Sequence, residues 1–146
     1  MSKKEFLTCL FTLMIASSWF SIYAEASATS IDQLKQKTWF GGAKDCLSDQ
    51  SPEIEVYQYN LDTYILRQNK CIHYEAPFIY LLFGENRTLL IDTGATKDSK
   101  KFPLAEKVHE IMFERAKRLK IEPNISPLVI AHSHSHEDHF AGDSQF

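Results

Sequence analysis

The stretch of sequence that decides the fold is residues 128–139, Leu-Val-Ile-Ala-His-Ser-His-Ser-His-Glu-Asp-His. Its first four residues are apolar and predict a short strand, and the polar residues after them predict a loop. Successive residues of an extended chain point to opposite sides, so the side chains of His134 and His136 point to the same side. Asp138 and His139 follow where the chain begins to turn, and as adjacent residues they project in different directions.

These four side chains predict a metal site. Imidazole and carboxylate groups together suit Zn²⁺ and, less selectively, iron or manganese. The alternative is an exposed histidine-rich loop that binds metal adventitiously, and His132 favours it because it continues the alternation backwards. The Asp138-His139 pair at the end of an apolar strand favours the dedicated site.

The segments upstream predict a layered α/β architecture. Runs of β-branched, aromatic and aliphatic residues between turn residues predict strands at residues 53–57, 63–67, 78–83 and 88–91. The aromatic residues of these strands are expected in the core of the sheet, namely Tyr57, Tyr59, Phe78, Tyr80 and Phe83. A helix is expected over residues 103–120, because apolar side chains recur there at helical spacing. The histidine loop then follows the last strand and lies at its carboxyl end.

The pattern His134-x-His136-x-Asp138-His139 after an apolar strand resembles the signature of the metallo-β-lactamase superfamily. Gly142 after the loop and the strand that ends in Asp92-Thr93-Gly94 resemble the family as well, and the likeness covers about residues 54–146. The resemblance implies an α/β fold, the first half only of a metallo-β-lactamase-type αββα sandwich, with a mixed β-sheet and a flanking helix.

The same resemblance implies a division of the chain. Residues 29–52 are an N-terminal lead-in, and residues 53–146 are expected to be the N-terminal half of the domain, truncated. In the family, later segments supply another histidine, a bridging carboxylate and a final histidine, and these ligands have no counterpart before Phe146. The chain is therefore expected to be a fragment of a complete enzyme.

The resemblance also implies a role for each residue of the site. His134 and His136 would bind a first zinc ion, and Asp138 and His139 a second, so that a complete site holds two Zn²⁺ ions. Asp138 would in addition orient the nucleophile and is the expected catalytic residue. Asp92 would lie beneath the site and orient the loop, with a simple strand-terminating turn as the alternative.

These roles imply an exported zinc-dependent hydrolase that acts on a small-molecule substrate. Metal-bound hydroxide would attack an ester, lactone, thioester, amide or phosphoester, and the fold does not choose among them. The alternative is a non-catalytic metal-binding remnant that lacks the second half of the site. A redox protein that binds iron at the same ligands ranks third, because this sequence retains the aspartate of the pattern at Asp138.

The N-terminus predicts export. Lys3 and Lys4 precede an apolar run from Phe6 to Tyr23, and small residues follow, which is the layout of a secretory signal peptide over residues 1–28. A periplasmic or secreted protein is expected, without membrane association after cleavage; an uncleaved membrane anchor is the alternative. The net charge of −3 offers no basic patch for nucleic acid, and the sequence leaves the oligomeric state open.

Two cysteines, Cys46 and Cys71, remain after the signal peptide is removed. An exported protein meets oxidising conditions, in which two cysteines can pair. Pairing requires that the two residues meet in the fold. The sequence therefore leaves open whether they form a disulfide or stay as two thiols.

Overall fold

The computed structural model describes residues 31–40, 43–122 and 127–146, so the signal peptide predicted at residues 1–28 lies outside the described residues. The chain divides into two compact units, residues 1–38 and residues 39–146. In the first unit, residues 31–36 form a helix. Within the described ranges, no helix has the length and apolar character needed to cross a membrane.

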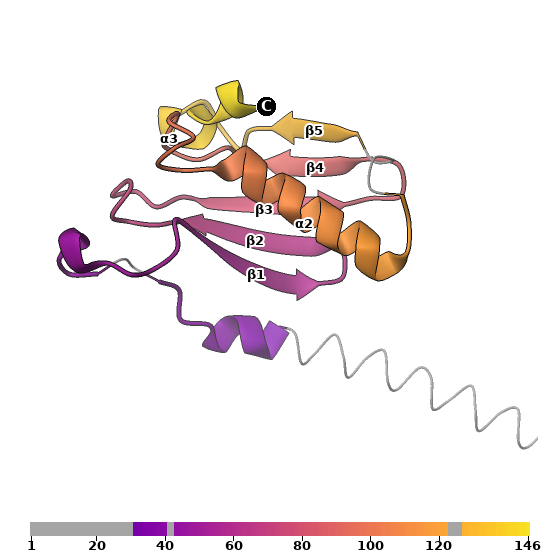
Figure 1. Ribbon diagram of the computed structural model, residues 1–146, viewed down its shortest axis with the longest axis horizontal. Helices are drawn as coiled ribbons and strands as arrows, with labels where there is room; N and C mark the ends of the chain where they lie inside the picture. The colour runs from indigo at the N-terminus through magenta and orange to yellow at the C-terminus, as the bar shows by residue number, and fades with distance from the viewer. Residues whose placement is uncertain (1–30, 41–42, 123–126) are drawn as a thin grey trace, which may run out of the picture. The chain divides into compact units, whose positions relative to one another are not determined.

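The second unit is built on one sheet of five strands, in the order β1-β2-β3-β4-β5 (Figure 1). The strands are β1 (Ile54–Asn60), β2 (Thr63–Gln68), β3 (Phe78–Phe83), β4 (Thr88–Ile91) and β5 (Leu128–Ala131). All five strands were expected, and β1 continues to Asn60 rather than ending at residue 57.

The sheet is mixed because its connections are of two kinds. Strands β1 to β4 follow one another through short connections and pair antiparallel. Strand β5 pairs parallel to β4, and the chain crosses between them through α2 (Leu104–Leu119). Figure 1 shows α2 lying across one face of the sheet. This is the mixed sheet with a flanking helix that the sequence predicts.

The core lies between the sheet and α2. It is made of aliphatic and aromatic side chains from the first four strands, from α2 and from the loop before α2, among them Leu66, Ile79, Leu81, Leu90, Phe102, Leu104, Val108 and Ile111. Burial of such side chains is the main favourable contribution to folding. The core therefore fixes α2 against the strands whose ends carry the candidate site.

Different hydrogen bonds cap the two ends of α2. Pro103 precedes the helix and has no side-chain acceptor, but the side-chain oxygen of Gln145 accepts hydrogen bonds from the backbone N–H groups of Leu104 (3.0 Å) and Ala105 (3.3 Å). At the other end Lys120 adopts a left-handed conformation and its N–H bonds the carbonyls of the last turn. The helix thus covers nearly the range expected from its apolar spacing.

The aromatic residues of the strands are less buried than the sequence predicts. Phe83 packs against the core, but Tyr57, Tyr59 and Phe78 are only half-buried and Tyr80 is 39% exposed. All of these aromatic residues except Phe83 alternate with the core residues of their strands. They therefore lie on the face of the sheet that is turned away from α2. The prediction that they form the core was wrong because strand propensity does not tell which face is covered.

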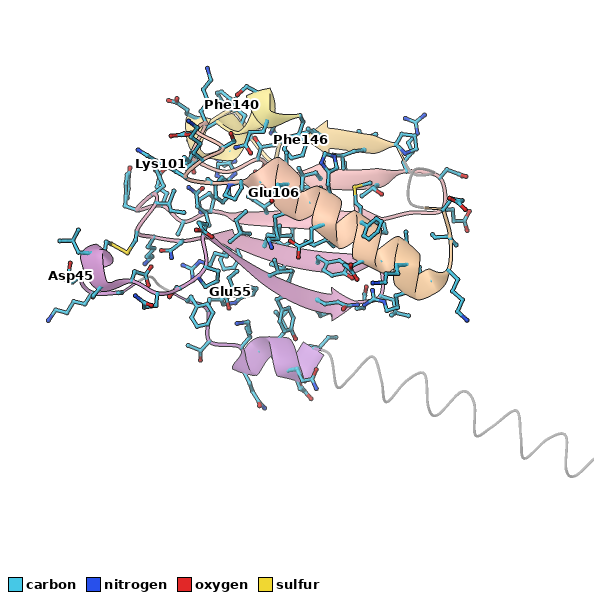
Figure 2. All side chains as sticks on the ribbon, viewed as in Figure 1. Asp45, Glu55, Lys101, Glu106, Phe140 and Phe146 are labelled. Carbon is cyan, nitrogen blue, oxygen red and sulfur yellow. A yellow bond between two sulfur atoms is a disulfide. The ribbon has the colours of Figure 1, made fainter. Side chains whose placement is uncertain are left out.

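The pairing of Cys46 and Cys71, which the sequence left open, is a disulfide in the structure (Figure 2). It joins the 3-10 helix η1 (Cys46–Ser48) to the connection between β2 and β3. Nearby, the side-chain nitrogen of Asn69 donates to the carboxylate of Asp49 (2.6 Å), and this hydrogen bond, with others from Ser51, lowers the pKa of Asp49. Residues 46–49 are therefore held to the connection between β2 and β3 by a covalent bond and by polar contacts.

Replacing Cys71 by serine is expected to lower the free energy of unfolding by about 3 kcal/mol, because the bridge closes a loop and restricts the unfolded chain. The sequence separation of the two cysteines is 25 residues. Urea unfolding followed by circular dichroism measures the loss. Cys46→Ser should lose as much, and dithiothreitol should lower the wild type to the level of both variants. A wild-type midpoint that dithiothreitol leaves unchanged contradicts a stabilising bridge.

Candidate metal centre

The histidine loop begins where β5 ends. A short helix, α3 (Glu137–Phe140), starts after His136, whose backbone is extended with φ −87° and ψ 145°. Asp138 and His139 therefore lie in the helical turn, as the sequence predicts. The chain bends at residues 133–135, so the extended conformation expected through His134 is not found there. Figure 2 labels Phe140, the last residue of α3, at the β5 edge of the sheet.

Three of the four predicted ligands gather in one group. His134, Asp138 and His139 each offer one ligand atom, and these atoms all lie within 4.8 Å of one another. The Nε2 atom of His139 is 2.9 Å from Oδ2 of Asp138, and its ring centre is 3.9 Å from that of His134. His136 lies beside the group, with its ring centre 4.7 Å from that of His134, but is not a member of it.

The donor set of this group fits a zinc ion. Two imidazoles and one carboxylate are ligands that zinc takes in proteins, and their spacing lets them approach a common point. His134 and His136 are exposed, whereas Asp138 and His139 are half-buried, so the group opens to solvent on one side. The division of the four residues between a first and a second ion stays a prediction.

Asp92 lies directly after β4, beneath the loop. It is only 3% exposed, and its carboxylate accepts hydrogen bonds from the backbone N–H of Ser133 (2.7 Å) and from its hydroxyl (2.8 Å). The same carboxylate lies 2.8 Å from Nδ1 of His139. The backbone of Asp92 is left-handed, with φ 67°, a conformation that aspartate tolerates better than most residues. The alternative of a simple turn residue does not account for these three contacts.

The contact with Asp92 determines how His139 presents its ring. Burial raises the pKa of the Asp92 carboxyl, but hydrogen bonds from His139 and Ser133 outweigh it and lower the pKa below its usual value. The carboxylate is thus ionised at neutral pH and can only accept. A proton is therefore required on Nδ1 of His139, and Nε2, which lies 2.9 Å from Oδ2 of Asp138, is the ring atom that faces the ligand group.

Backbone hydrogen bonds join the loop after β4 to the histidine loop. The N–H of Thr93 donates to the carbonyl of His139 (2.8 Å), and the N–H of Ala141 donates to the carbonyl of Gly94 (3.1 Å). Gly142 lies so close that an added Cβ atom would be 2.3 Å from the carbonyl oxygen of Thr93. A glycine is therefore required after the loop for steric reasons.

Three further residues near the site form hydrogen bonds, although no role was assigned to them from the sequence. The hydroxyl of Thr93 donates to the carboxylate of Asp143 (2.7 Å). The side chain of Gln68, fully buried in β2, accepts from the N–H of Ala95 (2.9 Å) and donates to Thr96 (2.7 Å), which fixes the loop after β4. The Asp-Thr-Gly motif pointed to Thr93. Gln68 and Asp143 carry no local signal, because their partners are distant in sequence.

Replacing Asp92 by asparagine is expected to weaken Zn²⁺ binding about 10- to 100-fold, as for other residues that orient a metal-binding histidine. Asparagine tolerates the left-handed backbone, so the charge is removed with little strain. Competition with a chromogenic chelator measures the affinity, and Asp98→Asn in the loop before α2 is the matched control. Unchanged affinity in Asp92→Asn contradicts an orienting role.

The sequence model of the metallo-beta-lactamase superfamily matches residues 75–146. Among solved structures, the chain is similar to a metallo-beta-lactamase from Erythrobacter litoralis with beta-mercaptoethanol in the active site, at 16% identity and a TM-score of 0.41. That similarity covers 66% of this chain and 38% of the length of the solved one. The comparison with curated proteins found no match.

The family match extends over β3, β4, α2, β5 and the whole histidine loop. It therefore includes both the strand that ends in Asp92 and the group formed by His134, Asp138 and His139. The mixed sheet with its flanking helix agrees with part of the α/β sandwich of that family. Through residues 75–146, the chain belongs to the metallo-β-lactamase superfamily.

Proposed function

We propose that the chain forms a zinc site of a hydrolase that acts on a small molecule. The observation that carries the proposal is the group of His134, Asp138 and His139, with the ring of His139 oriented by a buried carboxylate. Within the superfamily, hydrolysis is the activity that such a site supports best. The bond attacked is an ester, lactone, thioester, amide or phosphoester.

In this proposal each residue of the chain has a definite task. His134, His136, Asp138 and His139 hold the metal, and Asp92 keeps the proton of His139 on Nδ1. A bound zinc ion supplies an activated water at neutral pH and polarises the substrate. Asp138 is half-buried and faces the ligand group, so its carboxylate can orient the attacking water and accept its proton. The open side of the group admits the substrate.

We further propose that the protein is exported, to the periplasm or out of the cell. The disulfide between Cys46 and Cys71 supports this location, because disulfides persist in oxidising compartments and are rare in the cytosol. The signal-peptide pattern of residues 1–28 supports it as well.

A second candidate function is metal binding without catalysis. One observation favours it: in the described part of the chain, the ligand group has three members and leaves His136 outside. Three ligands are enough to bind zinc, and a catalytic site also needs substrate contacts. Binding and hydrolysis therefore have to be measured separately.

The metal site is tested by titrating the protein with Zn²⁺. His134→Ala and His139→Ala are each expected to weaken binding by more than about 10-fold, because each removes a ligand. His109→Ala, at an exposed histidine on α2, is the matched control and should bind as the wild type does. Equal affinity in all four proteins would mean adventitious binding. Metal analysis of the native protein that finds iron instead of zinc would favour the redox alternative.

Hydrolysis is tested on the zinc-loaded protein with chromogenic esters, lactones, thioesters, amides and phosphoesters. Asp138→Asn is expected to lower kcat/KM at least about 100-fold on whichever substrate is cleaved, because it removes the group that orients the water. Glu137→Gln changes the exposed neighbour and should keep the activity. Full activity in Asp138→Asn contradicts the role of Asp138, and zinc binding with no hydrolysis by the wild type favours the second candidate.

A further inference from the structure

His132 lies at the start of the histidine loop, outside the ligand pattern, and its ring is held between two oxygen atoms. Its Nδ1 atom is 3.1 Å from the main-chain carbonyl oxygen of His139. Its Nε2 atom is 3.2 Å from Oδ2 of Asp143. A carbonyl oxygen can only accept a hydrogen bond, so the first contact requires a proton on Nδ1. The ring therefore donates to the backbone of a proposed metal ligand.

The carbonyl oxygen of His139 accepts two hydrogen bonds. It accepts from the N–H of Thr93 (2.8 Å) as well as from His132 (3.1 Å). The N–H of His139 in turn donates to the carbonyl of His136 (3.0 Å). Both main-chain polar groups of His139 are thus engaged. The direction in which its side chain leaves the backbone depends on these hydrogen bonds.

Asp143 connects this arrangement to the loop after β4. One carboxylate oxygen faces the ring of His132, and the other accepts a hydrogen bond from the hydroxyl of Thr93 (2.7 Å). Thr93 is therefore linked to the carbonyl of His139 in two ways. Its N–H donates to that carbonyl directly, and its hydroxyl bonds Asp143, which faces the ring of His132. Asp143 begins the 3-10 helix η2 (Asp143–Gln145), whose Gln145 bonds the first turn of α2.

We propose that His132 is a positioning residue that holds the turn carrying Asp138 and His139 in place for metal binding. The inference rests on the proposed metal site. The ring ties the last residue of the ligand group to Asp143 and so to the loop that contains Asp92. A residue that orients a ligand in this way contributes to affinity without contacting the metal.

The alternative role for His132 is that of a further metal ligand in a histidine-rich loop. The geometry opposes it, because both ring nitrogens already face oxygen acceptors. Another carboxylate oxygen, Oδ1 of Asp92, is 4.0 Å from Nδ1 and thus farther than the carbonyl of His139. Among the described residues, the group of possible ligands includes His134, Asp138 and His139 but not His132.

The test uses His132→Leu and His132→Asn, a matched pair of similar shape in which only asparagine can donate a hydrogen bond. The first readout is amide hydrogen exchange of metal-free protein at Thr93, whose N–H shares the carbonyl of His139 with the ring. Exchange at Thr93 is expected to be roughly 3- to 10-fold faster in His132→Leu. It should return toward the wild-type rate in His132→Asn. Amides of the central strand β3 serve as the internal reference and should not change.

The second readout is Co²⁺ affinity and the visible absorption of the bound Co²⁺. His132→Leu is expected to bind about 10-fold more weakly or worse, with His132→Asn recovering most of the affinity and both keeping the wild-type bands. If the two variants lose affinity equally, or shift the bands, His132 is a ligand or a space-filling residue and the proposal is overturned. Unchanged exchange at Thr93 in His132→Leu overturns it as well.

The two readouts separate this inference from the proposed function. A wild-type protein that binds no Co²⁺ overturns the metal site, while the exchange rates at Thr93 still decide whether His132 holds the turn. Should His132→Leu not fold, Asp143→Ala takes its place, because the Asp143 side chain is 49% exposed and its removal leaves no buried gap. Wild-type exchange at Thr93 in that variant would also refute the proposal.

Discussion

The buried carboxylate of Asp92 is the interaction on which the candidate site depends. It accepts two hydrogen bonds from Ser133 and contacts Nδ1 of His139, and so joins both ends of the histidine loop to the end of β4. The left-handed backbone that brings it there costs about 1 kcal/mol for an ordinary residue. Strain of this kind persists where surrounding contacts offset it, and such positions cluster at functional sites.

The fold makes this interaction possible because β4 and β5 are parallel. Ile91 is paired with Ala131, and the N–H of Asp92 donates to the carbonyl of Ala131 (2.9 Å), so the two strands end side by side. A parallel pair needs a crossover, and α2 provides it by packing on the sheet. The core beneath α2 is therefore what brings the Asp-Thr-Gly loop and the histidine loop together.

Much of this could be predicted from the sequence, and the rest depends on tertiary contacts. Apolar runs and turn residues located the strands, and the spacing of the loop indicated the candidate ligands, since both signals are local. The exposure of Tyr80 and the links made by Asp143 and Gln68 had no such signal, because they depend on which segments lie opposite one another in space. Likewise, alternation predicted that His134 and His136 share a side but not that His136 stays outside the group.

The candidate ligands of the site are not held equally. His139 is fixed at its N–H, at its carbonyl and at Nδ1, and its side chain is 19% exposed. His134 and His136 are exposed and lie in the loop before α3, which bends at residues 133–135. If the proposed metal binds here, His139 would be a ligand that is already oriented, and the adjustment would fall on the two exposed histidines. Preorganisation of His139 reduces the entropy that binding removes, because only the remaining ligands have to be ordered.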